Sequence, residues 1–328
     1  MNTESPALDT EYGAEYGVRL KRVLARYGIY IAFAMLFVFL SLWSPWFLTV
    51  DNILNILRQC SINGIIAIGA TLVIITGGID LSVGAIVALA AVGASSMAHP
   101  DTYPVIVPIL VGLAVGGFSG SINGFIIAKG GIAPFIVTLG MMTIVRGAAL
   151  VLSNGRPVIN LSDSYNAIGG GYLWGIPLPV FLFVAVVLIG VFLLHFSKFG
   201  RHVYAVGGNE LAAKVSGVNV SNVKIGVYTL AGLFAGFAGI ILSSRVMTGS
   251  PAAGSGYELD AIAAVVIGGT SLAGGSGIIL GTVVGTLIIG TMNNGLDLLN
   301  VSSYFQQIVK GIIIISAVLL DQSTKYSR

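Results

Sequence analysis

Residues 53–76 read ILNILRQCSINGIIAIGATLVIIT, a stretch rich in isoleucine, leucine and alanine. Because about 20 mostly apolar residues are enough for a helix to cross a membrane, this stretch predicts a transmembrane helix. Similar stretches recur along the whole chain. The predicted helices, about ten in all, cover residues 27–48, 53–76, 80–98, 104–127, 132–152, 178–197, 224–244, 259–273, 277–293 and 304–320.

The composition indicates the same class of protein. Of the 328 residues, 55% are hydrophobic and 9% are charged, whereas a soluble domain carries about 25% charged residues. So few charges cannot cover a water-exposed surface, and we therefore expect an all-α polytopic membrane protein surrounded by lipid. The chain is expected to form one transmembrane domain over residues 1–328. The net charge of +3 gives no indication of a nucleic-acid partner.

The first apolar stretch follows a positively charged segment, which is also a feature of secretory signal peptides. Here the charged segment is too long, and no small-residue cleavage site follows Ile29 to Leu42. Trp43, Pro45 and Trp46 follow instead, and aromatic residues anchor helices at the membrane surface. We interpret the stretch as a retained helix after a cytoplasmic segment at 1–26.

The distribution of lysine and arginine predicts the orientation, because these residues gather on the cytoplasmic side of membrane proteins. If the N-terminus is cytoplasmic, an even number of helices makes both termini cytoplasmic. Only Arg156 and Arg245 then lie at helix ends on the opposite side. The cytoplasmic helix ends hold Arg19, Lys21, Arg22, Arg26, Lys129, Lys198, Arg201, Lys214, Lys224, Lys325 and Arg328.

The order of the helices permits an inverted repeat, a common feature of transporters. Predicted helices two to five and seven to ten form two sets that start on opposite sides of the membrane. Sequence similarity between the sets is limited to glycine-rich stretches around Gly77-Gly78 and Gly274-Gly275. The stretch 259–273 is short for a span, and we expect a tilted or discontinuous helix there.

The sequence lacks the signatures of an enzyme. No GxxxxGK[ST] loop is present, so the chain is not expected to hold ATP phosphates and hydrolyse ATP. No His/Cys cluster or HExxH motif indicates a metal site. We predict no catalytic residues, no metal and no cofactor bound by this chain. A membrane enzyme would need clustered His, Asp or Glu near one interface, and none is seen.

Charged residues inside predicted spans are informative, because each costs at least roughly 2.5–3.5 kcal/mol at the bilayer centre. Asp80, between the second and third helices, either caps a helix as a structural hinge or serves transport. Arg146 either reaches toward the membrane surface or pairs with a carboxylate. Asp260 opens the eighth helix and forms an acidic pair with Glu258 at the outer mouth, and Lys310 lies in the last helix.

Polar side chains within the spans offer the hydroxyl and amide groups that a neutral polyol needs along its path. The same groups also hold helices together, and both interpretations stay open. The candidates for a translocation pathway or gate are Asn63, Thr71, Asp80, Ser82, Asn123, Thr138, Thr270 and Asn293.

The connection at 198–223 is predicted to lie in the cytoplasm and to contain a short helix. The Gly207-Gly208 pair is expected to interrupt the chain, and Asn209 to cap a helix over Glu210–Val215. Gly217 is expected to end that helix in a left-handed conformation. A solvated loop does not need a capped helix, whereas a docking element for a cytoplasmic partner does.

This connection resembles the coupling loop in the membrane subunits of bacterial ABC importers, which carry a Glu-Ala-Ala pattern followed by three residues and Gly. Glu210, Ala212, Ala213 and Gly217 match it, with Leu211 inserted where the family usually has Ala. Four other segments resemble the ribose-type branch of sugar importer permeases. They are GGIDLSVG at 77–84, GYELDAIAAVVIGGTSLAGG at 256–275, TVDNILNIL at 49–57 and NNGL at 293–296.

The resemblance implies a permease of the bacterial inner membrane that forms, with a second copy, the pathway for a monosaccharide such as ribose. A separate cytoplasmic ABC ATPase would use ATP and Mg and dock on the helix that includes Asn209 and Glu210. A periplasmic or lipid-anchored sugar-binding protein would deliver the sugar, and Glu258 and Asp260 are its candidate contacts. A stand-alone channel or facilitator for a small polar solute fits the composition equally well, but it gives the capped helix no role.

Overall fold

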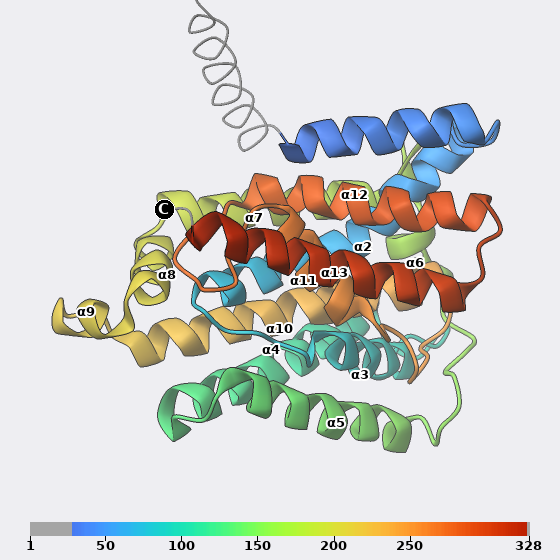
Figure 1. The fold of residues 1–328 in the computed structure, drawn as a ribbon. Helices are drawn as coiled ribbons and strands as arrows, with labels where there is room; N and C mark the ends of the chain where they lie inside the picture. The colour runs from blue at the N-terminus through green and yellow to red at the C-terminus, as the bar shows by residue number, and fades with distance from the viewer. Residues whose placement is uncertain (1–27, 327–328) are drawn as a thin grey trace, which may run out of the picture.

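The computed structural model describes residues 28–326, which form a bundle of helices (Figure 1). The predicted cytoplasmic segment at 1–26 lies outside the described residues, as do Arg328 and the side chain of Lys325. After a first helix at Gly28–Trp43, the elements are α2 (Val50–Ile75), α3 (Val83–Ser96), α4 (Ile106–Gly130), α5 (Pro134–Leu152), α6 (Asp163–Gly170), the hairpin β1 (Tyr172–Leu173) and β2 (Ile176–Pro177), α7 (Leu178–Val191) with a π-helical turn (Phe192–Phe196), α8 (Lys198–Gly208), α9 (Glu210–Val215), α10 (Val220–Arg245), α11 (Tyr257–Ile267), α12 (Ile279–Leu298) and α13 (Ser303–Tyr326).

Six of these helices are long and apolar enough to cross a membrane: α2, α4, α5, α7 with its π-helical turn, α10 and α12. The first helix and α3 are apolar but shorter. Side-chain caps define several helix starts. The hydroxyl of Thr49 accepts from the backbone N–H of Asn52 at the start of α2, and the Asn219 side chain accepts from Asn222 at the start of α10.

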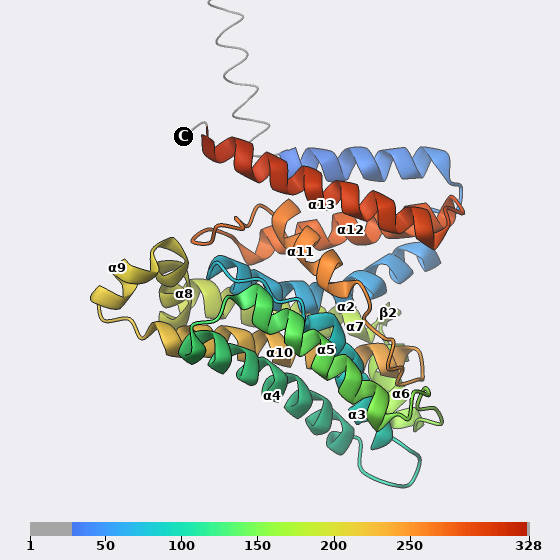
Figure 2. The same cartoon turned by 60° about the horizontal axis from the view of Figure 1, so that its bottom comes forward.

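The centre of the bundle is α10, which packs against α2, α3 and α4. Its backbone lies very close to that of α4. A Cβ added to Gly116 or Gly120 would overlap backbone atoms of Gly232 or Tyr228 on α10. Small residues of this kind let membrane helices approach closely, because the space between them does not have to hold side chains. Both views place the first helix on one side of the bundle and α4 with α5 on the other (Figure 2).

The connections gather at two ends of the bundle. At one end, which carries α9 and is called the α9 end below, the hydroxyl of Ser221 donates to the Ala128 carbonyl, joining the start of α10 to the end of α4. At the opposite end, the Arg245 guanidinium donates to Asn55 at 3.2 Å and joins the end of α10 to the start of α2. Successive long helices therefore run back and forth between the same two ends.

Helices occur at all ten predicted positions, with some corrected boundaries. The helix predicted at 80–98 begins only at Val83, because Asp80 and Ser82 form the turn that precedes it. The stretch 259–273 is helical only as far as Ile267, where the backbone turns through Gly269 with φ of 86°. The helix at this position is therefore shorter than the predicted stretch, while α6, α8 and the hairpin were not predicted.

Candidate functional site

The α9 end carries the predicted short helix with its predicted boundaries. The side chain of Asn209 accepts from the backbone N–H of Ala212 at 2.9 Å, and Gly217 follows the helix with φ of 86°. These are the two caps that the sequence indicates. Helix α9 projects from the bundle, away from the long helices (Figure 1).

The surface of α9 is apolar on its exposed side. Leu211 and Val215, one helical turn apart, are 76% and 89% exposed, whereas Ala213 is buried. On the side toward the bundle, Lys224 of α10 forms an ion pair with Glu210 at 2.7 Å. The geometry therefore anchors α9 to α10 by one face and leaves Leu211 and Val215 free to meet another protein.

Helix α8 joins α9 to the ends of two other helices. The backbone N–H of Gly275, in the connection after α11, donates to the carbonyl of Ile75 at the end of α2 at 2.8 Å. Gly207 lies directly against both of these atoms. The Tyr204 hydroxyl donates to the Gly277 carbonyl at 2.6 Å. Burial raises the pKa of Tyr204, so its hydroxyl remains protonated and able to donate.

The prediction that Gly207 and Gly208 interrupt the chain is wrong, because both residues belong to the last turn of α8. Their φ angles are not in the left-handed region that favours glycine. Glycine is required at position 207 for a different reason. Helix α8 approaches the end of α2 and the connection after α11 so closely that no side chain fits there. Helix α8, which leads into α9, thus contacts the end of α2 and the connection after α11 through the backbone of Gly207 and the hydroxyl of Tyr204.

Two of the charged residues in the spans pair with each other. Lys310 of α13 forms an ion pair at 3.0 Å with Asp260 of α11, and Asp260 is only 5% exposed. Arg146 of α5 pairs with no carboxylate at this distance. Its guanidinium donates instead to the carbonyls of Pro251 and Ala253, at 2.7 and 2.8 Å, in the segment before α11. These contacts join α13 to α11, and α5 to the segment that precedes α11.

Glu258 and Asp260 do not form one exposed acidic surface. Glu258 is partly buried, approaches Gly84 of α3, and accepts from the backbone N–H of Gly256 at 3.3 Å. Asp260, two residues further along α11, faces Lys310. Both carboxylates are therefore engaged within this chain.

Asp80 belongs to a buried hydrogen-bond network. Its Oδ1 accepts from the backbone N–H and the hydroxyl of Ser82, at 2.8 and 2.6 Å. The hydroxyl of Ser82 accepts in turn from Asn123 of α4 at 2.8 Å, and Thr138 of α5 donates to the Ile79 carbonyl at 3.2 Å. Ser82 is the N-cap residue of α3, and Asp80 supports it from two residues before. The network fixes the start of α3 against α4 and α5.

Replacing Asp80 by alanine is expected to lower the free energy of unfolding by about 1–3 kcal/mol, because two buried donors of Ser82 lose their acceptor. Asp80→Asn retains an acceptor oxygen and should remain close to the original protein. Thermal unfolding of the purified protein in detergent measures both. If Asp80→Ala unfolds like the original protein but does not transport, Asp80 serves the pathway instead of the fold.

The other candidate pathway residues lie apart from this network. Thr71 of α2 shares a hydrogen bond of 2.7 Å with Thr282 of α12. Thr270 and Asn293 are buried, and Asn63 is partly buried. The structure therefore brings together Asp80, Ser82, Asn123 and Thr138, but the remaining four do not belong to this network.

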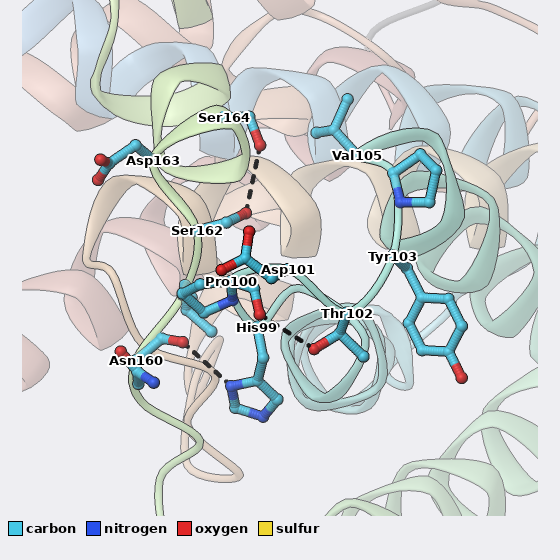
Figure 3. A pocket seen from close by; sticks show the side chains of 12 residues that line it. His99, Pro100, Asp101, Thr102, Tyr103, Val105, Asn160, Ser162, Asp163 and Ser164 are labelled. Atoms are coloured by element: carbon cyan, nitrogen blue, oxygen red, sulfur yellow. Dashed lines mark hydrogen bonds between the residues drawn. The ribbon is translucent and has the colours of Figure 1, made fainter.

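The end opposite α9 carries two features that the sequence analysis did not identify. A hollow of about 680 Å³ lies between the α3–α4 connection and the segment before α6, where His99 Nδ1 and the Asn160 carbonyl are 3.0 Å apart (Figure 3). Arg58 of α2 lies over the ring of Tyr172, with its guanidinium carbon 4.9 Å from the ring centroid. Arg58 stands within an apolar stretch, so its place at a helix contact with the hairpin was not apparent.

Among the residues that the structure describes, no group of three or more His, Cys, Asp or Glu side chains could hold a metal ion. The arrangement consists of a docking helix at one end, polar contacts between spans, and loops with charged and aromatic residues at the other end.

Comparison with known proteins identifies the family. A family model described as the permease component of the branched-chain amino acid transport system matches residues 52–318. The chain is 51% identical to the ribose import permease of Bacillus subtilis, over 98% of this chain and 99% of that one. It is 48% identical to the ribose import permease of Escherichia coli (89% of this chain, 92% of that one) and 40% identical to the L-arabinose transport system permease of the same species (92% of each). No solved structure matches significantly. The chain therefore belongs to the permease family of import systems, in the branch that holds the ribose-type permeases of ABC importers.

Proposed function

We propose that this chain is the membrane-spanning subunit of an ATP-driven importer and forms the pathway for ribose across the bacterial inner membrane. The observation that carries the proposal is the identity of 51% to a ribose import permease along almost the whole length of both chains. Relatives named for L-arabinose are less similar, at 41% and 40% identity. Ribose is therefore the first substrate to test, followed by other pentoses.

In the proposed topology ten helices traverse the membrane, both termini are cytoplasmic, and the α9 end faces the cytoplasm. The α9 end collects positive charge, as expected of a cytoplasmic face. Its described residues include Lys129, Lys198, Arg201, Lys214 and Lys224, whereas the opposite end carries Arg58, Arg156 and Arg245.

The helix lengths support an inverted repeat of α2–α5 and α10–α13. Each set begins with a helix of 26 residues, continues with a short helix, and ends with two longer ones. The short helices, α3 and α11, have 14 and 11 residues and both follow a non-helical segment. This pattern agrees with two halves that start on opposite sides of the membrane.

We propose that α9 docks on a separate cytoplasmic ATPase, which binds and hydrolyses ATP with Mg, while this chain binds no cofactor. The docking residues are Asn209, Glu210, Ala212, Ala213 and Gly217, to which the structure adds the exposed Leu211 and Val215. The other partners in the proposal are a second copy of this chain and a sugar-binding protein at the opposite end. There the proposed contacts are Arg58 and the hollow beside His99, because Asp260 is buried in its ion pair with Lys310 and Glu258 is partly buried against α3.

Replacing Leu211 by glutamate is expected to lower ATPase recruitment and transport together, since it places a charge in the apolar centre of a small docking surface. Co-purification with the ATPase and ribose uptake by proteoliposomes measure the two effects. Ile159→Glu is the matched control for ATPase co-purification, because Ile159 is also an exposed apolar residue but lies at the end opposite α9, beside the proposed contact of the binding protein. Equal loss in both variants would contradict the docking role of α9.

The proposed function is tested by reconstituting the chain with its ATPase and its sugar-binding protein. We expect ribose to stimulate ATP hydrolysis and to enter the vesicles only with ATP. Downhill ribose flux through this chain alone would identify a facilitator instead. Stimulation by another pentose, but not by ribose, would keep the importer and change its substrate.

A further inference from the structure

Helices α11 and α13 lie side by side and enclose a groove of about 490 Å³ on the outside of the chain (Figure 1). Its lining is unusual for a surface of membrane-spanning helices. The polar groups come from Ser255 before α11 and from Ser303, Gln306, Gln307 and Lys310 of α13. Hydroxyl, amide and ammonium groups are costly against lipid tails, so this face is expected to meet water or a polar ligand.

The polar residues of α13 form a single stripe. Gln306, Gln307 and Lys310 lie three, four and seven residues after Ser303, which places all four on one face of the helix. Most other exposed positions of α13 among the described side chains are apolar, and they include Phe305, Ile308, Ile312, Ile315 and Leu319. Helix α13 thus separates a polar groove from an apolar surface suited to lipid.

The groove extends from the end opposite α9 into the membrane. It begins at Ser303, the first residue of α13, and reaches Ile314. Because a helix rises 1.5 Å per residue, this segment is about 16 Å long, roughly half of the 30 Å hydrocarbon core. The groove therefore has the length of a half-channel that opens at one side of the membrane only.

The charge state of the groove favours a neutral ligand. Lys310 is its one cation among the lining residues, and the buried carboxylate of Asp260 neutralises it at 3.0 Å. Gln306 is held in place, since its Nε2 donates to Asp297 at 2.7 Å and to the Val301 carbonyl at 3.0 Å. Gln307 is exposed and offers both an amide donor and an acceptor. Such groups can form hydrogen bonds with the hydroxyls of a sugar. An anion would find no unpaired positive charge among the lining residues.

We propose that the α11–α13 groove is the outward half of the translocation pathway and that it takes a neutral, polyhydroxylated solute the size of a pentose. This inference rests on the proposed function and assigns a place for its substrate. In this proposal the outer face of α13 lines the pathway, and residues within the bundle, such as Asn123 and Thr71, do not. The deep end lies near the Asp260–Lys310 pair, so that pair positions the two walls of the groove.

The groove can be tested by cysteine labelling, because the chain's single native cysteine, Cys60, is buried. We expect Gln307→Cys, in the reconstituted importer with its ATPase and binding protein, to react with a membrane-impermeant thiol reagent and to lose ribose uptake on reaction. Ile308→Cys is the matched control: it is the next residue, is also exposed, and lies on the apolar side. It should react slowly and retain uptake.

Three results would overturn the inference. Equal reactivity of the two variants would mean that α13 has no polar face open to water. An unreactive Gln307→Cys would indicate that a second copy or another helix covers the groove. Reaction without loss of uptake would place the solute elsewhere. Ribose uptake by the unmodified importer is measured in parallel, and its absence would contradict the proposed function independently of the labelling pattern.

Discussion

Replacement of Gly207 by alanine is expected to destabilise the α9 end strongly and to abolish transport. A Cβ at this position would overlap the carbonyl oxygen of Ile75 and approach the backbone nitrogen of Gly275. These two atoms are hydrogen-bonded to each other at 2.8 Å, so the new methyl group would have to separate them. Backbone atoms cannot rotate away as a side chain can. We therefore expect the upper part of the range for overpacking, about 3 kcal/mol.

The neighbouring glycine supplies the control. Gly208 ends the same helix, yet a Cβ there would meet no atom within 4 Å. Gly208→Ala should therefore unfold at the temperature of the original protein and retain transport. Thermal unfolding in detergent and ribose uptake in proteoliposomes compare the two variants. If both variants behave alike, Gly207 does not lie as close to Ile75 and Gly275 as described.

Helix α9 shows what sequence can predict in this protein. Its start and end were predicted to the residue, because the caps at Asn209 and Gly217 depend only on a few neighbouring residues in the sequence. The ten helical stretches were predicted for a similar reason, since hydropathy accumulates along each segment. The start of α3 moved to Val83 because the polar turn of Asp80 and Ser82 precedes it, and hydropathy does not detect such a turn.

The features that sequence did not predict depend on residues far apart in the chain. Gly207 was interpreted as a helix breaker, but the reason for glycine there lies in Ile75 and Gly275. Arg146 was expected either to reach toward the membrane surface or to pair with a carboxylate, whereas its guanidinium donates to two backbone carbonyls of the segment before α11. Hydropathy also cannot separate a polar side chain in a helix contact from one that faces a solute. For this reason, the stripe at Gln306 and Gln307 was not singled out.

Replacement of Lys310 by methionine is expected to destabilise the protein by about 3–5 kcal/mol, because it leaves the carboxylate of Asp260 buried without a counter-charge. Asp260 is 5% exposed, so water cannot replace the lost ammonium group readily. The pair also joins α11 to α13, which means that its loss should loosen both walls of the groove. Protein yield after membrane extraction and thermal unfolding in detergent measure the effect.

The double variant Asp260→Asn/Lys310→Met separates the cost of a lone buried charge from the loss of the contact itself. Removing both charges should restore most of the lost stability, since replacing a whole buried pair is often close to neutral. The control is Lys224→Met, which breaks the ion pair with Glu210, a residue with 53% of its side chain exposed. It should cost only about 0–1 kcal/mol. A double variant as unstable as Lys310→Met would mean that the pair acts through its geometry, because then neutralising Asp260 gives no relief.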